Sequence, residues 1–329
     1  MRKYILFFVL GFVFTTANTQ DLRIATFNCE FLVKRKVHIK YDLNFDIRKE
    51  PDSIRLIWND TFREARFREA CQAVAEQIVE IDADVIGLTE VGKKEDLEIL
   101  LEELTRLGLH YPFFELCKST DTSTGQHVAV LSKFELTDVV KQFNQRALYY
   151  TEADMDEVKQ TGISKGLKVS FEQGLQKFDL FVFHFKSERG GNESDAQRIA
   201  QAEIARRLIL PYIKDDHNVI VLGDFNSEKR HKVLSVLRGF EDIGEEMIQT
   251  GDDSYFESFE NRWTYQFRGN SEQIDHILLS LNFLKLCKPN RWSSDPNKVQ
   301  FGIKTCILQT TRPIISDHNP IYVDLVFRQ

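Results

Sequence analysis

The chain has 329 residues, of which 42% are hydrophobic and 28% are charged, and its formal net charge at pH 7 is −7. This composition is typical of a globular protein with a large core. An acidic chain does not resemble proteins that coat nucleic acid through nonspecific charge, although an enzyme can still bind phosphate through a metal and a few local cations.

The first 20 residues differ from the rest of the chain. Arg2 and Lys3 precede an apolar run over residues 4–14, and small residues follow at 15–17. This pattern predicts a secretory signal peptide and therefore a secreted or periplasmic protein, with an uncleaved anchor as the alternative. Loss of the two basic residues would take the net charge from −7 to −9. No other stretch is long and apolar enough to cross a bilayer, so no stable membrane partner is expected.

Strand-like and helix-like patterns alternate from residue 21 onward. The predicted strands are 22–28, 84–89, 127–132, 167–171, 178–185, 219–222, 274–279, 303–309 and 321–327. A helix is predicted to open at Thr61, where Glu64 completes a capping box, and its apolar stripe includes Phe67, Cys71, Val74, Ile78 and Ile81. Further helices are predicted over 95–107, from Ser194 (with Gln197 as its capping partner) to Pro211, and over 229–237.

Two polar segments have no clear period, 33–60 and 244–270, and they are interpreted as loops that control specificity. No linker or internal repeat divides the chain. We therefore predict one mixed α/β domain over residues 21–329.

Polar side chains recur where the apolar strands end. Gly223 is expected to let the chain turn, and Asp224 and Asn226 are two residues apart, which in an extended chain directs both to one side. Any one such residue is more often an ordinary turn residue. The recurrence predicts a single site at the strand ends, built from Asn28, Glu90, His184, Asp224, Asn226, Asp275, Asp317 and His318.

The donor types in this set indicate the chemistry. The five cysteines show no CxxC or Cys/His zinc spacing, and Cys29 and Cys71 fit buried apolar positions. Carboxylate and amide oxygens suit Mg²⁺, Mn²⁺ or Ca²⁺ better than zinc. A hard cation, two histidines and an aspartate that orients water together favour hydrolysis of a phosphate ester.

With this set of residues, the chain resembles the endonuclease/exonuclease/phosphatase superfamily of deoxyribonuclease-type, metal-dependent phosphoesterases. The matching segments are 25–28, 87–91, 183–187, 222–226, 273–277 and 316–320, in the family's order over nearly the whole chain after residue 20. The resemblance implies a four-layer sandwich, an α/β (α+β) fold in which two mixed β-sheets are flanked by helices. It also implies a catalytic site at one edge of the sheets.

The resemblance also implies a role for each residue. Glu90 would be the main ligand of Mg²⁺, or of Mn²⁺ in its place, with Asn28 and Asp317 beside the metal. Asp224 would orient the attacking water and Asn226 would bind a phosphoryl oxygen. His318, oriented by Asp275, and His184 would face the phosphate.

Other polar residues have weaker claims. Lys186 could equally contact phosphate or be a solvated lysine, and the Arg189 loop fits a plain glycine turn. His276 is expected to point away from the site, because it follows Asp275 in a strand.

The substrate is the least determined part. The segments 183–191 and 264–276 resemble secreted bacterial nuclease-like members, so the predicted partner is a phosphate ester in nucleic acid. A phosphatase, a sphingomyelinase-like lipid phosphodiesterase and a catalytically lapsed binding module are the alternatives. The oligomeric state is left open.

Overall fold

The computed structural model describes residues 21–38, 50–151, 154–240, 242–256, 262–267, 269–291, 293, 300–310 and 315–328. The predicted signal peptide lies outside these residues. Within them, no helix has both the length and the apolar character needed to cross a membrane.

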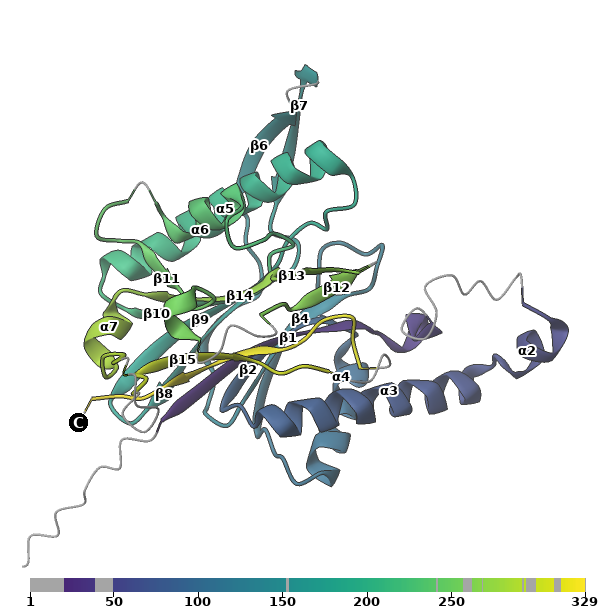
Figure 1. The fold of residues 1–329 in the computed structure, drawn as a ribbon. Helices are drawn as coiled ribbons and strands as arrows, with labels where there is room; N and C mark the ends of the chain where they lie inside the picture. Colours follow the sequence, from purple (N-terminus) through teal and green to yellow (C-terminus); the bar gives the residue numbers. More distant parts are fainter. Residues whose placement is uncertain are drawn as a thin grey trace, which may run out of the picture.

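Two six-stranded sheets form the centre of the fold (Figure 1). The first runs in the order β15 (Ile303–Ile307), β16 (Ile321–Leu325), β1 (Leu22–Leu32), β2 (Val85–Val91), β4 (His127–Ser132) and β3 (Phe113–Cys117). The second runs β11 (Met247–Gln249), β14 (Asp275–Ser280), β10 (Asn218–Asp224), β9 (Gln176–His184), β8 (Gly166–Gln173) and β5 (Thr137–Val140). Each is mixed, since β1 pairs parallel with β2 and β9 parallel with β10, while the other pairings are antiparallel.

The sheets pack face to face, and helices cover both outer faces. Apolar residues of the two inner faces form one fully buried cluster, which includes Ile24 of β1, Val323 of β16 and Leu222 of β10. The outer face of the first sheet packs on α3 (Asp60–Ile81) and α4 (Lys94–Arg106), and that of the second on α5 (Gly191–Lys214) and α6 (Lys232–Arg238). The predicted four-layer sandwich is confirmed.

Two hairpins and several short elements complete the described chain. The hairpins are β6 (Arg146–Thr151) with β7 (Asp154–Gly162), and β12 (Tyr265–Phe267) with β13 (Asn270–Glu272). The short elements are η1 (Lys34–Lys36), α2 (Asp52–Ile57), η2 (Asp253–Tyr255) and α7 (Asn282–Leu286). Strands β3, β5, β6, β7, β11, β12 and β13 were not predicted, and the two segments interpreted as loops contain several of the short elements.

The predicted capping boxes are both wrong. Asn59 caps α3, accepting a hydrogen bond from the Phe62 backbone amide, so the helix begins one residue before Thr61. Helix α5 begins at Gly191, and the Ser194 hydroxyl donates to the carbonyl of Arg189. Nor does Pro211 end this helix, which continues to Lys214. The stripe on α3 is confirmed, because all five predicted residues are buried.

Glycine is required at residue 223 for a different reason from the turn that the sequence predicted. It lies inside β10 with φ of +133°, and a Cβ there would overlap the backbone carbonyl of Phe183 in β9. Glycine is therefore required by the close approach of two paired strands, one residue before Asp224.

Candidate active site

A cleft of about 950 Å³ opens where the two sheets end. Six of the eight predicted site residues line it: Glu90, His184, Asp224, Asn226, Asp317 and His318. The other two lie directly behind this lining. Asn28 donates from Nδ2 to Oδ2 of Asp224 over 2.8 Å, and Asp275 lies 2.7 Å from the His318 ring. The structure therefore brings all eight together.

The register of the second sheet accounts for three of them. His184 pairs with Asp224 across the parallel β9–β10 ladder, and Asp224 pairs with Asp275 across the antiparallel β10–β14 ladder. These residues lie side by side at the end of the sheet although they are far apart in sequence. His276 points away, as predicted: it is fully buried, stacks on Phe225 and lies 2.8 Å from the carbonyl oxygen of Ser227.

Irregular backbone positions the remaining residues. The β1–β2 register shifts between Asn28 and Leu32, and the β2–β4 register shifts at Glu90. Four cleft-lining residues without the freedom of glycine have positive φ: Glu30 (40°), Phe31 (49°), Glu90 (60°) and Asn226 (48°). Such backbone is costly and is retained where the surrounding structure enforces it, often at functional sites.

Asp224 and Asn226 converge through a turn. The backbone amide of Asn226 donates to Oδ1 of Asp224 over 2.8 Å, and the Asn226 Nδ2 donates to the carbonyl of Phe185. The sequence argument assumed an extended chain here, and this is wrong, because Asn226 has left-handed backbone. Both side chains still reach the cleft.

Asp224 is an unusual carboxylate. It is 1% exposed and accepts hydrogen bonds on both oxygens, from Asn28 and from the Asn226 backbone. Burial raises its pKa to about 7, with the charge of Asp275 adding to the rise and that of His318 opposing it. A carboxylate with a pKa near neutrality can take a proton from water.

The two histidines have opposite protonation preferences. Burial alone would lower the pKa of His318, but the charges of Asp275, Asp317 and Asp224 outweigh it and raise that pKa well above its ordinary value. Burial, with the charges of Lys165 and His318, lowers the pKa of His184 well below its ordinary value. At neutral pH, His318 is therefore cationic and His184 neutral.

The loop before β16 holds His318 in place. The Ser316 hydroxyl donates to the carbonyl of Asn28 and accepts from the His318 backbone amide. The Tyr265 ring packs against the imidazole, with 4.8 Å between centroids. Behind it, Thr264 Oγ1 accepts the backbone amides of Ile274 and Asp275, which fixes the start of β14.

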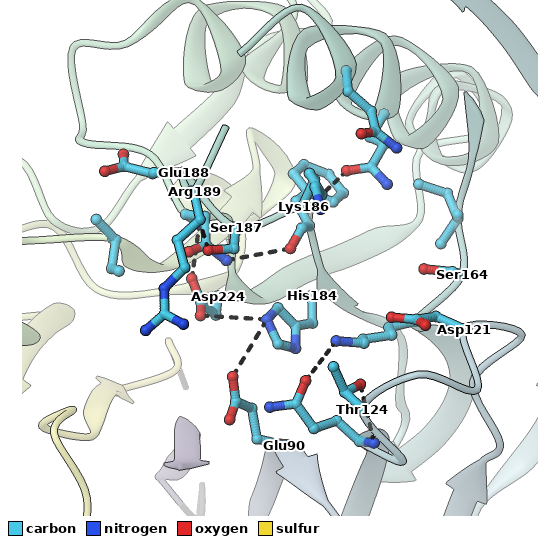
Figure 2. Close-up of a pocket in the computed structure, with 18 of the residues that line it drawn as sticks. Glu90, Asp121, Thr124, Ser164, His184, Lys186, Ser187, Glu188, Arg189 and Asp224 are labelled. Carbon is cyan, nitrogen blue, oxygen red and sulfur yellow. Dashed lines mark hydrogen bonds and ion pairs between the residues drawn. The ribbon is translucent and has the colours of Figure 1, made fainter. Parts of the chain in front are cut away.

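His184 occupies the middle of the cleft. Its Nε2 lies 3.7 Å from Oε1 of Glu90 and 3.7 Å from Oδ2 of Asp224, and Figure 2 shows it between these carboxylates. Arg189 lies on the Asp224 side of it, while Asp121 and Ser164 lie on the other side. The cleft thus continues in both directions from the central carboxylates.

Oxygen donors suited to a hard cation surround this centre. Glu90 accepts the Phe31 backbone amide on Oε2, and Glu30 accepts the Asp317 amide, so both carboxylates are held by the backbone. A second grouping, Asp224 with Asp275 and His318, has ligand atoms within 4.8 Å of one another. The buried Oδ1 of Asp275 has no hydrogen-bond partner in the described part of the chain. This oxygen-rich set fits a divalent cation such as Mg²⁺.

Sequence reasoning missed several cleft residues. Glu30 gave no signal, because its approach depends on the bulge after Asn28. Lys165 belongs to no motif in the sequence, yet it is buried in the cleft and donates to Oε1 of Gln126 over 2.8 Å. Lys186, which the sequence left undecided, lines the cleft, and so does Arg189, whose loop was interpreted as a plain glycine turn.

Comparison with known proteins agrees with this geometry. A sequence model of the Endonuclease/Exonuclease/phosphatase family matches residues 25–318. This chain belongs to that family. Its members are metal-dependent phosphoesterases, so the protein is a phosphoester hydrolase. A search of the curated proteins found no match.

Solved structures share the fold at low identity. Truncated TDP2 from Caenorhabditis elegans matches 93% of this chain and 98% of its own, with 16% identity and a TM-score of 0.55. Beta toxin from Staphylococcus aureus, in a mutant with bound magnesium ions, matches 93% of this chain and 100% of its own, with 12% identity and a TM-score of 0.56. An endonuclease/exonuclease/phosphatase family protein from Bacteroides thetaiotaomicron matches 94% and 99%, with 15% identity and a TM-score of 0.51.

Proposed function

We propose that this protein hydrolyses phosphodiester bonds of nucleic acid with water, using Mg²⁺ or, in its place, Mn²⁺. The observation that carries the proposal is the pairing of a buried carboxylate of raised pKa, Asp224, with a cationic histidine, His318, in one cleft. One cleft thereby offers a base that can take a proton from water and a positive charge that can bind a phosphoryl oxygen.

Asp224 acts on the attacking water in this mechanism. The hydrogen bonds from Asn28 and the Asn226 amide fix the carboxylate. It takes one proton from water while the water oxygen forms a bond to phosphorus. The bond from phosphorus to the leaving oxygen breaks, and its electron pair departs with that oxygen.

His318, Asn226 and His184 bind the phosphoryl oxygens. His318 donates from Nε2, because Nδ1 faces Asp275. Asn226 donates one amide hydrogen to Phe185, and the second remains for the substrate. His184 is neutral and adds a hydrogen bond without a second positive charge beside His318.

Glu90, Asn28 and Asp317 are the residues proposed to hold the cation. Their side-chain oxygens are the donor type that a hard divalent cation prefers. When bound, the cation neutralises charge on the phosphoryl and leaving oxygens. The chain's own contribution is to fix these donors through the Phe31 amide and the Ser316 bridge.

Three exposed cations in the cleft are available to a polyanionic substrate. Arg146, Lys186 and Arg189 line the cleft and are exposed, and in the described residues no carboxylate oxygen lies within 4.0 Å of their cationic nitrogens. Carboxylates outnumber cations in the cleft as a whole, so these three arginine and lysine side chains are its main exposed contacts for phosphate. Nucleic acid offers phosphates on both sides of the scissile bond for these cations to bind.

A substrate panel with a metal titration tests the proposal. Wild type with Mg²⁺ should cleave single- or double-stranded DNA or RNA and bis-p-nitrophenyl phosphate, EDTA should abolish cleavage, and Asp224→Asn should be inert. Cleavage confined to sphingomyelin or inositol phosphates would overturn the nucleic-acid assignment. If wild type and Asp224→Asn are equally inert on every substrate, the protein is a binding module with this fold.

A further inference from the structure

The β6–β7 hairpin projects from the body of the protein beside α5 (Figure 1). Exposed and covered side chains alternate along residues 146–150 of β6 and residues 158–161 of β7. Three large apolar side chains are on the exposed face: Leu148 (65% exposed), Tyr150 (54%) and Val158 (55%). Exposed apolar residues that share one face mark a binding surface more often than scattered ones do.

The opposite face is firmly attached to α5. Ala147 and Tyr149 pack into the cluster formed with that helix. Lys159 Nζ lies 2.9 Å from Oε1 of Glu193, and Gln197 Nε2 donates to the hydroxyl of Thr161. These contacts hold residues 147–149 and 159–161 of the hairpin against α5, so the opposite face is the one open to a ligand.

This outer face continues the wall of the catalytic cleft. Arg146, Gly162 and Gln160 lie on the same face, at the base of the hairpin, and all three line the cleft. Gly162 is paired with Arg146, and a Cβ on it would be 2.5 Å from Arg146 Nη1, so the arginine lies flat across the glycine. Leu148 is paired with Gln160, and Tyr150 follows at a further step of about 7 Å along the strand.

The order of side-chain types along this surface, from the cleft outward, matches one kind of ligand. Cations come first, at Arg146 and Lys186 beside the catalytic centre, and apolar and aromatic side chains come next. Single-stranded nucleic acid has the same combination, because its phosphates need cations while its unpaired bases stack on aromatic rings. A duplex keeps its bases stacked inside. An anionic bilayer is disfavoured by the sequence over 152–157, which has four carboxylates that anionic headgroups would repel.

We propose that the outer face of the β6–β7 hairpin binds the unpaired nucleotides next to the scissile phosphate, so that the enzyme prefers single-stranded substrates. The inference rests on the proposed nuclease function. Arg146 contacts the phosphate adjoining the scissile one, and Tyr150, with Leu148 and Val158, stacks on a base.

Two hairpin variants and a matched control test the inference. Tyr150→Ala and Leu148→Ser should each reduce kcat/KM on a single-stranded oligonucleotide about tenfold, mainly through KM, and leave bis-p-nitrophenyl phosphate hydrolysis unchanged. Leu175→Ser removes a fully exposed leucine from the β8–β9 turn and should change neither activity. Thermal melts should match wild type for all three, because these side chains are exposed.

The outcomes separate this inference from the function on which it rests. If wild type hydrolyses bis-p-nitrophenyl phosphate but no oligonucleotide, the nuclease function and the inference both fail. Suppose that wild type cleaves oligonucleotides. If the hairpin variants then keep the wild-type kcat/KM on the oligonucleotide, or lose activity equally on the oligonucleotide and on bis-p-nitrophenyl phosphate, only the inference is overturned. It is also overturned if the variants lose binding to phosphatidylserine vesicles, or lose self-association that wild type shows, while oligonucleotide cleavage is retained.

Discussion

Nδ1 of His318 lies 2.7 Å from Oδ2 of Asp275, and both side chains are buried. The carboxylate charge is the main reason that the pKa of His318 rises against the effect of burial. Asp275→Asn keeps the shape of this side chain and removes its negative charge. We expect the pKa of His318 to fall, so that the imidazolium is lost at lower pH than in wild type, and kcat/KM to fall about a hundredfold or more.

NMR titration of the histidine ring in the metal-free protein measures the first effect, and phosphodiester hydrolysis measures the second. Asp324→Asn is the matched control, since Asp324 pairs with Arg23 away from the cleft. An unchanged His318 titration in Asp275→Asn would show that the carboxylate does not set the charge of this histidine.

The metal ligands can be separated by single substitutions. Glu90→Gln removes a charge from the proposed ligand set, whereas Asp224→Asn removes one from the buried grouping with Asp275 and His318. If Glu90 holds the cation, Glu90→Gln should weaken Mg²⁺ binding at least about tenfold, and Asp224→Asn should lower turnover with a smaller effect on affinity.

The increase in melting temperature with Mg²⁺ concentration gives the affinity without any need for activity. Glu102→Gln, on the exposed face of α4, serves as the control. A large loss of affinity in Asp224→Asn with none in Glu90→Gln would place the cation in the buried grouping instead.

The sequence predicted nine of the twelve strands in the two large sheets, and it predicted eight residues that meet at the cleft. Apolar runs that end in Asn28, Glu90, His184 or Asp224 predicted strand ends, and the order of these segments predicted the fold. The pairing register of the strands could not be predicted from these apolar runs. That His184, Asp224 and Asp275 lie in one row depends on pairing between three strands distant in sequence.

Local backbone geometry was the main source of error. Helix starts were misplaced because Thr61 and Ser194 have capping side chains, although Asn59 and Gly190 occupy the cap positions. Glu30 was missed because a bulge, which has no reliable sequence signal, turns it into the cleft. Asn226 was placed correctly for a wrong reason, since a turn and not an extended strand directs it.

A buried ion pair at the opposite end of β9 is predicted to support stability. Asp179 is 1% exposed, lies 2.9 Å from Lys168 Nζ and 2.7 Å from His217 Nδ1, and accepts the Ser170 hydroxyl. Asp179→Asn leaves the Lys168 charge buried without its counter-ion. We expect a loss of about 3–5 kcal/mol in the free energy of unfolding.

The pH dependence of this loss has a definite sign. Burial raises the pKa of Asp179, but the Ser170, Lys168 and His217 contacts outweigh it and leave the pKa below its ordinary value. The ionised form therefore stabilises the fold above the unfolded-state pKa of about 4, and the contribution is lost as the pH falls further. Denaturant unfolding of both proteins from pH 7 to pH 3 measures this, and a constant difference over that range would contradict it.

Gly223 provides the sharpest test of the strand geometry beside Asp224. A side chain at this residue would have to adopt a φ of +133° and would overlap the Phe183 carbonyl, which is backbone and cannot rotate away. We expect Gly223→Ala to cost about 3–5 kcal/mol of unfolding free energy, from backbone strain and overpacking together. Any folded fraction should also have low activity, because the His184–Asp224 pairing would shift.

Gly174→Ala is the matched control, since Gly174 also has positive φ (62°) but no atom lies within 4 Å of the added Cβ. It should cost no more than about 1–2 kcal/mol, the strain of left-handed backbone alone. Denaturant unfolding of the two variants gives the comparison. Equal losses would mean that positive φ is the whole requirement at Gly223 and that the close approach of β9 and β10 plays no part.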